Sequence, residues 1–342
     1  MAAGTDGRRT TWRDEGPGGT HPRRTGSVEV VEVGPRDGLQ NEATLLPTEA
    51  KVELVRRALA AGARRIEATS FVHPRLVPQM ADAEAVMAAV TAPGFLPEGV
   101  DRDDVRFIGL VLNPRGLDRA LAAGVDEVNV VVAASETFSR RNQNVGVTEM
   151  LDAADDVARR AHDAGIGASA VVSTAFGCPF EGEVPPEAVL AIVDRCLAAG
   201  YGEIALADTI GVGVPAQVRT LVAGVRALEG GGGDPAAGSG TVRLRAHFHN
   251  TRNTGYANAF AAVESGVEVL DASIGGIGGC PFAPNATGNI ATEDLQYLLE
   301  RSGWSTGLDL AQLAAAGTWI AELLGRQAPA LLGRAGPFPS PS

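Results

Sequence analysis

From residue 28 onward the chain alternates between two patterns of hydrophobic and polar positions. Short runs rich in Val, Ile and Ala are followed by Ala-, Leu- and Arg-rich segments in which apolar residues recur at the helical period, as in 48–63 and 150–165. The first pattern is typical of β-strands and the second of amphipathic helices. The predicted strands are 28–33, 64–70, 105–111, 126–134, 167–174, 202–208, 242–249 and 267–273.

Glycines mark the places where several predicted helices end. They follow Ala or Ser just before the next strand, at Gly62, Gly124, Gly165, Gly200 and Gly266. Glycine adopts the left-handed backbone conformation that often closes a helix, so these positions are expected C-caps. Two further helices are predicted at about 291–302 and 309–324.

The number and spacing of these units predict an α/β fold. Eight strand-then-helix units in about 250 residues favour a (β/α)8 TIM barrel with additional C-terminal helices. A doubly wound open sheet is the alternative, but no GxGxxG follows the first strand and eight even units favour closure. The glycine-rich segment 230–240 is expected to be a loop on the N-terminal face of the barrel.

We expect the barrel domain to span 28–326, preceded by a disordered arm at 1–27 and followed by a loose tail at 327–342. The arm has no apolar stretch of the kind found in secretory signals. Its arginines are typical of transit peptides, but Asp6, Asp14 and Glu15 count against that interpretation.

Composition narrows the possible partners. Lysine and arginine total 29 against 41 acidic residues, a net charge of −12, which argues against binding to nucleic acid or to anionic membranes. No apolar run approaches the length of a transmembrane helix. Three widely spaced cysteines, Cys178, Cys196 and Cys280, indicate a reducing compartment, and we expect a cytoplasmic protein.

Polar residues gather where the predicted strands end, and in a barrel of this kind those ends form one mouth. They are Arg36 and Asp37, Glu67, Asp208, His247 and His249, and finally Cys280 and Asn289. His247 and His249 lie two positions apart on a strand, so both point to the same face and can share a metal ion. Two half-buried structural histidines are the alternative. The convergence of all these residues on one rim favours a functional site.

Four sequence motifs of this chain resemble those of a known enzyme family. "VEVGPRDGLQNE" (31–42), "IEATSFV" (66–72), "ADTIGVG" (207–213) and "GGCPFAPNATGNIATEDL" (278–295) resemble 3-hydroxy-3-methylglutaryl-CoA lyases, and the likeness runs over residues 28–324. It implies a divalent cation, Mg²⁺ or Mn²⁺, held by Asp37, His247, His249 and Asn289, a ligand set that suits either ion. It also implies that Arg36, Gln40 and Ser70 contact the substrate, and we expect Arg252 to be a further substrate contact.

The reaction implied by the resemblance is cleavage of a 3-hydroxyacyl-CoA between C2 and C3. With 3-hydroxy-3-methylglutaryl-CoA the products are acetyl-CoA and acetoacetate, a step of leucine degradation. Asp37 or His247 would accept the proton of the C3 hydroxyl, and Arg36 would stabilise the enolate. Cys280 would return a proton to carbon, while Glu67 and Asp208 line the site. The resemblance also implies a homo-oligomer, with a dimer expected.

Three residues depart from the lyase pattern, namely Asn250, Arg252 and Asn285. An HxHN sequence is shared with isopropylmalate and homocitrate synthases, which are condensing acyltransferases, but those enzymes lack the GGCPF loop. A lyase for a related 3-hydroxy-3-substituted acyl-CoA, a condensing acyltransferase and a non-catalytic metal-binding barrel are therefore the alternatives. Arg252 could bind a differently placed carboxylate or face solvent.

Overall fold

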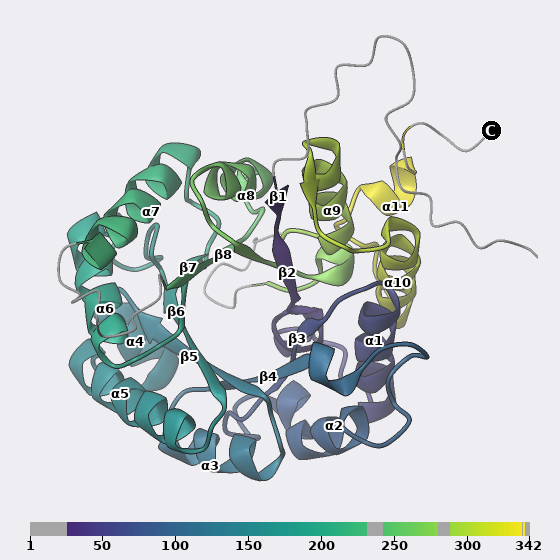
Figure 1. The fold of residues 1–342 in the computed structure, drawn as a ribbon, viewed down its shortest axis with the longest axis horizontal. Helices are drawn as coiled ribbons and strands as arrows, with labels where there is room; N and C mark the ends of the chain where they lie inside the picture. Colours follow the sequence, from purple (N-terminus) through teal and green to yellow (C-terminus); the bar gives the residue numbers. More distant parts are fainter. Residues whose placement is uncertain (1–25, 231–241, 280–287, 337, 339–342) are drawn as a thin grey trace, which may run out of the picture.

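Eight parallel strands close into a barrel, as the sequence predicts (Figure 1). The computed structural model describes residues 26–230, 242–279, 288–336 and 338 of the 342-residue chain. Most of the predicted arm, the glycine-rich loop, Cys280 and Asn285 lie outside these residues. In barrel order the strands are β2 (Glu29–Glu32), β3 (Arg65–Ser70), β4 (Arg106–Val111), β5 (Glu127–Ala133), β6 (Gly167–Ser173), β7 (Glu203–Asp208), β8 (Arg243–Phe248) and β9 (Val269–Ala272).

The helices surround the barrel as an outer ring (Figure 1). They are α1 (Thr48–Ala60), α2 (Ala83–Val90), α3 (Pro114–Ala122), α4 (Glu136–Gln143), α5 (Val147–Asp163), α6 (Pro186–Ala198), α7 (Pro215–Gly230), α8 (Gly255–Glu264), α9 (Thr292–Arg301) and α10 (Leu310–Leu323). The two predicted C-terminal helices correspond to α9 and α10. All five predicted C-cap glycines have positive φ; at Gly62, with φ +100°, a Cβ would also lie 2.6 Å from the carbonyl oxygen of Gly307.

Both ends of the barrel domain are longer than predicted. Strand β1 (Gly26–Ser27) pairs in parallel with β10 (Trp304–Ser305), so the last two residues of the predicted arm are ordered. Helix α11 (Leu332–Ala335) lies within the predicted loose tail. The part of the tail that the structure describes packs because Ala330 and Leu332 are buried and because Asp294 accepts hydrogen bonds from the backbone N–H groups of Leu331 and Leu332.

The main hydrophobic core joins residues of the strands and of the surrounding helices in one large cluster. The interior of the barrel is different, because charged side chains meet there. Arg65 of β3 hydrogen-bonds to Glu127 of β5 and to Glu203 of β7, strands that are not neighbours in the barrel. Arg65 thus links strands across the barrel near their N-terminal ends. Among the described residues, no helix has the length and apolar character needed to span a membrane.

Candidate metal centre at the barrel mouth

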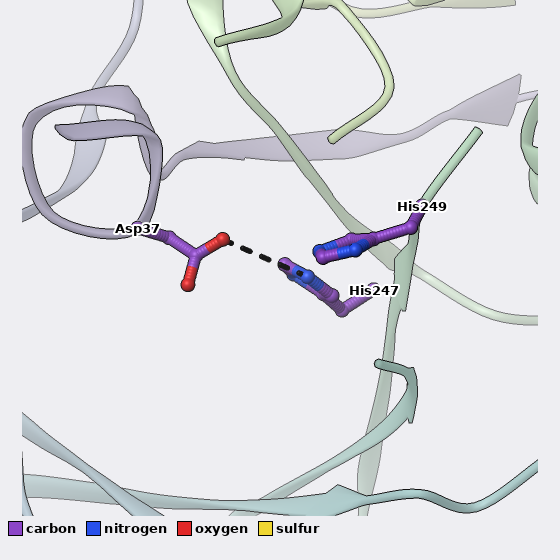
Figure 2. Close-up of side chains that lie close together, drawn as sticks. All are labelled: Asp37, His247 and His249. Atoms are coloured by element: carbon purple, nitrogen blue, oxygen red, sulfur yellow. Dashed lines mark ion pairs between the residues drawn. The ribbon is translucent and has the colours of Figure 1, made fainter. Parts of the chain in front are cut away.

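Three of the predicted metal ligands come together at the carboxyl ends of β2 and β8 (Figure 2). Asp37 lies in η1 (Gly34–Gly38), the π-helical turn after β2, His247 is in β8, and His249 follows that strand. One ligand atom from each of the three lies within 4.8 Å of the others, and the two imidazole centroids are 5.1 Å apart. The alternation of a strand thus places both histidines on the same face.

Two glycines allow η1 to turn tightly against the end of the barrel. A Cβ on Gly34 would lie 2.5 Å from Oε1 of Glu32, and a Cβ on Gly38 would lie 2.7 Å from side-chain atoms of Ser273 and Ile277. Any larger residue at these positions would push the turn outward. The close fit of η1 sets the direction of Arg36 and Asp37, which lie between the two glycines.

Asn289 joins the cluster from the segment before α9. His249 and Asn289 form a single antiparallel backbone bridge. The Asn289 amide donates to Oδ2 of Asp37 at 2.8 Å and to the carbonyl oxygen of Ile277 at 3.1 Å. The structure therefore brings all four predicted ligands to one place.

The donor atoms fit a divalent cation. Nδ1 of His249 and Oδ1 of Asn289 are buried and have no hydrogen-bond partner among the described residues, which is costly unless something else takes their lone pairs. Burial alone would raise the pKa of Asp37, but Arg36 and the two histidines bring it well below its usual range. Burial and the neighbouring His247 lower the pKa of His249 to about 4. A carboxylate and a neutral imidazole at neutral pH are the forms that bind metal.

Arg36 is held rigidly beside this cluster. Its Nε donates to Oε2 of Glu67 at 2.7 Å and its Nη1 to Oδ1 of Asp37 at 2.6 Å. Glu67 is fully buried, and its other oxygen accepts from the amide of Asn129 at 2.8 Å. Glu67 thus positions Arg36. Asn129 was not predicted from the sequence. The only available signal was a polar residue inside a predicted strand.

His247 has a second partner that sequence reasoning also missed. Its Nδ1 lies 3.0 Å from Oδ2 of Asp271, the residue directly opposite it on β9. The other oxygen, Oδ1, accepts a hydrogen bond from Nε of Arg245 at 2.5 Å. The available signal was an acidic residue in the middle of the predicted eighth strand, "VEVLDAS".

Asp208 is buried at the end of β7, where it fixes the following turn. Its two oxygens accept hydrogen bonds from the backbone N–H groups of Val212 and Gly213, both at 2.9 Å. Burial raises the pKa of this carboxyl. The side chains of Gln40 and Ser70 approach each other, with 3.5 Å between Oε1 and Oγ.

The two described departures from the lyase pattern make local contacts. Nη1 of Arg252 donates to the carbonyl oxygens of Ile210 and Gly211, at 3.1 and 3.0 Å, in the turn after Asp208. Oδ1 of Asn250 accepts from the N–H of Gly255, the first residue of α8. Each side chain therefore joins backbone segments around the mouth.

Comparisons with known proteins show what this chain is similar to. The HMGL-like family model matches residues 27–320. The (R)-citramalyl-CoA lyase of Chloroflexus aurantiacus is 46% identical over 316 residues, covering 91% of this chain and 95% of that protein. A hydroxymethylglutaryl-CoA lyase of Bacillus subtilis is 40% identical over 303 residues, covering 88% and 95%. A solved HMG-CoA lyase of Acinetobacter baumannii, in complex with coenzyme A and 3-methylmalate, matches with a TM-score of 0.81 at 36% identity, covering 92% and 97%.

Proposed function

This chain belongs to the HMGL-like family and is a hydroxymethylglutaryl-CoA lyase-like enzyme, and from that premise we propose that it cleaves a branched 3-hydroxyacyl-CoA between C2 and C3. The first candidate substrate is 3-hydroxy-3-methylglutaryl-CoA, which gives acetyl-CoA and acetoacetate. The observation that carries the proposal is the convergence of Asp37, His247 and His249 beside the guanidinium of Arg36.

The proposed cofactor is Mg²⁺ or Mn²⁺, held by Asp37, His247, His249 and Asn289. Carboxylate, amide and imidazole donors suit these ions, and the buried lone pairs of His249 and Asn289 support a ligand at this place. When bound, the ion would polarise the C3 hydroxyl and lower its pKa. Asp37 would accept the hydroxyl proton, since its carboxylate borders the same space as the imidazole of His247.

Arg36 would stabilise the negative charge that develops on the thioester oxygen. Three of its five N–H groups are directed to Glu67 and Asp37, through Nε, Nη2 and Nη1, which leaves one each on Nη1 and Nη2 for the substrate. Because the guanidinium is already fixed by Glu67, little reorganisation is needed as the bond breaks. Cys280 would protonate the enolate carbon, a role that rests on the resemblance of its loop.

A second candidate substrate is citramalyl-CoA, favoured by the 46% identity to the Chloroflexus aurantiacus enzyme over nearly the whole chain. This thioester also carries a methyl group, a hydroxyl at C3 and a terminal carboxylate. It lacks one methylene between C3 and that carboxylate, and its cleavage gives acetyl-CoA and pyruvate. One methylene changes discrimination by about 1–3 kcal/mol, so one pocket can strongly prefer either compound.

The test is a cleavage assay of the purified protein with Mn²⁺ and each thioester in parallel. Acetyl-CoA is measured together with acetoacetate or pyruvate, and we expect kcat/KM for one substrate to exceed the other by about tenfold or more. Release of free CoA from acetyl-CoA plus a 2-oxo acid, without cleavage, would identify a condensing acyltransferase instead. Failure on every 3-hydroxyacyl-CoA tried would favour a non-catalytic metal-binding barrel. That the protein forms a dimer and works in the cytoplasm stays a prediction.

A further inference from the structure

A buried arginine inside the barrel serves no purpose in the chemistry described so far. Arg245 lies in β8, two positions before His247, and is fully buried. Its Nε donates to Asp271, and Nη1 lies 3.6 Å from Oε1 of Glu203 as an ion pair. Nη1 and Nη2 have no hydrogen-bond partner among the described residues.

Such an arginine is a poor stabilising element. A buried charge loses its hydration, and the loss is offset only when its remaining N–H groups find partners. Of the three guanidinium nitrogens of Arg245, only Nε has a hydrogen-bond partner among the described residues. An apolar side chain packed at this position would avoid the loss of hydration. Stability therefore does not explain the arginine, and its one hydrogen bond, to Asp271, indicates its role.

Asp271 links Arg245 to a predicted metal ligand. One carboxylate oxygen contacts Nε of Arg245 and the other contacts Nδ1 of His247, so the two contacts fix the rotation of the carboxylate. A carboxylate at Nδ1 favours the tautomer with hydrogen on Nδ1 and a free lone pair on Nε2. Nε2 is the atom that faces Asp37, at 3.9 Å from Oδ2.

We propose that Arg245 is a positioning residue of the metal centre, which fixes Asp271 so that Asp271 holds His247 in the orientation and tautomer that bind the ion. The proposal rests on the metal site of the proposed function. In this proposal Arg245 acts on the ion only through Asp271 and His247, and it contacts neither the substrate nor the ion. Without the guanidinium, Oδ1 of Asp271 loses its partner and the carboxylate can rotate away from the imidazole.

Arg65 provides a matched control. It is a second arginine of the barrel interior, 6% exposed, and its guanidinium hydrogen-bonds to Glu127 and Glu203 at the N-terminal end of the strands. It therefore shares with Arg245 the residue type, the burial and one carboxylate partner, Glu203. It does not contact Asp271 or His247 in the described structure.

The first experiment measures Mn²⁺ affinity by calorimetry for the wild type, Arg245→Met, Arg245→Lys and Arg65→Met. We expect Arg245→Met to weaken binding about 10- to 100-fold, the usual effect of losing a group that supports a ligand. Arg245→Lys should recover part of the loss, because an ammonium can still contact Asp271. Arg65→Met should bind as the wild type does, even though it unfolds at lower urea concentration.

The second experiment reads the tautomer directly, by ¹⁵N NMR of labelled imidazoles in the metal-free protein, at a pH raised until the signals of His247 no longer shift. With five histidines in the chain the spectrum is sparse. His247 should carry its hydrogen on Nδ1 in the wild type and should show a mixture in Arg245→Met. If that variant does not fold, Arg245→Met/Asp271→Asn removes both buried charges, and it should show the same loss of tautomer preference and of affinity.

The outcomes separate the two proposals. A wild type that binds no Mn²⁺ contradicts the proposed metal site, yet the NMR experiment still tests Arg245. Wild-type affinity and an unchanged tautomer in the Arg245 variants overturn the positioning role and leave the proposed function standing. A loss of affinity in Arg65→Met equal to that in Arg245→Met would also overturn it, because any buried charge would then have the same effect.

Discussion

His249 is one of the four proposed metal ligands. It is buried, its Nδ1 lacks a partner among the described residues, and burial lowers its pKa to about 4. We predict that His249→Ala weakens Mn²⁺ affinity by at least tenfold in calorimetry, because a ligand nitrogen is lost while the barrel stays folded. Cleavage should fall by several orders of magnitude. His162→Ala, on the exposed side of α5, is the control, and an unchanged affinity of His249→Ala would make the histidine pair structural.

Residues that end a strand were easier to predict than residues inside one. Asp37, His247 and Asn289 belong to motifs at strand ends, where the fold class alone says that side chains converge. Asp271, Asn129 and Arg245 are buried polar residues in strand interiors, and the sequence marks them only as breaks in apolar runs. Their partners depend on the register between neighbouring strands, as in the pairing of His247 with Asp271. The sequence of one strand alone does not determine this register.

At the scale of elements, two buried carboxyls join η1, α9 and η5 (Ile274–Gly276). Glu32 accepts hydrogen bonds from the N–H groups of Gly34 and Ile274 and from the hydroxyl of Thr292. Glu293, in the first turn of α9, accepts from the N–H of Gly275 with both oxygens. Burial is the largest cause that raises the pKa of Glu32 to about 7 and that of Glu293 to about 8.

These shifts predict a pH dependence of stability. A carboxyl whose pKa is raised by folding stabilises the protein fully below its unfolded pKa, and this contribution is lost as pH rises through the folded value. The contribution of these two carboxyls to the free energy of unfolding should therefore decline between about pH 4.5 and pH 8. Glu293→Gln should lessen the decline by about 1–3 kcal/mol, measured by urea unfolding at several pH values. Glu322→Gln, exposed on α10, should follow the wild type, and parallel curves for Glu293→Gln would contradict the assignment.

The order of the elements could be predicted, but their ends could not. Each of the eight apolar runs has the residue pattern of a strand and is followed by a segment with the pattern of a helix. This repeated unit predicts the barrel. The pairing of Gly26–Ser27 with Trp304–Ser305 has no such signal, since two-residue strands are too short for a period. Helix α11 was missed because four residues between Pro- and Gly-rich segments do not form a helix without tertiary contacts.

For the whole molecule, a bound ion would join distant parts of the chain. Asp37 comes from the beginning of the barrel, and the histidines and Asn289 come from near its end. We predict that Mn²⁺ at about 100 times its dissociation constant adds about 2.7 kcal/mol to the free energy of unfolding and raises Tm by a few degrees. A thermal melt with and without EDTA measures this. The shift should vanish in His249→Ala, and a wild-type Tm indifferent to EDTA would contradict the prediction.

Closure of the barrel depends on a pairing between its first and last strands. Glu29 to Glu32 align with Val269 to Ala272, so β2 meets β9 across almost the whole described chain. During synthesis β2 therefore keeps one unpaired edge until most of the protein has left the ribosome, and such edges are sites of aggregation. The centre that needs Asp37 and Asn289 together assembles later still. A nascent chain of this protein could not acquire the proposed ion early, and metal loading would be among the last events of its biogenesis.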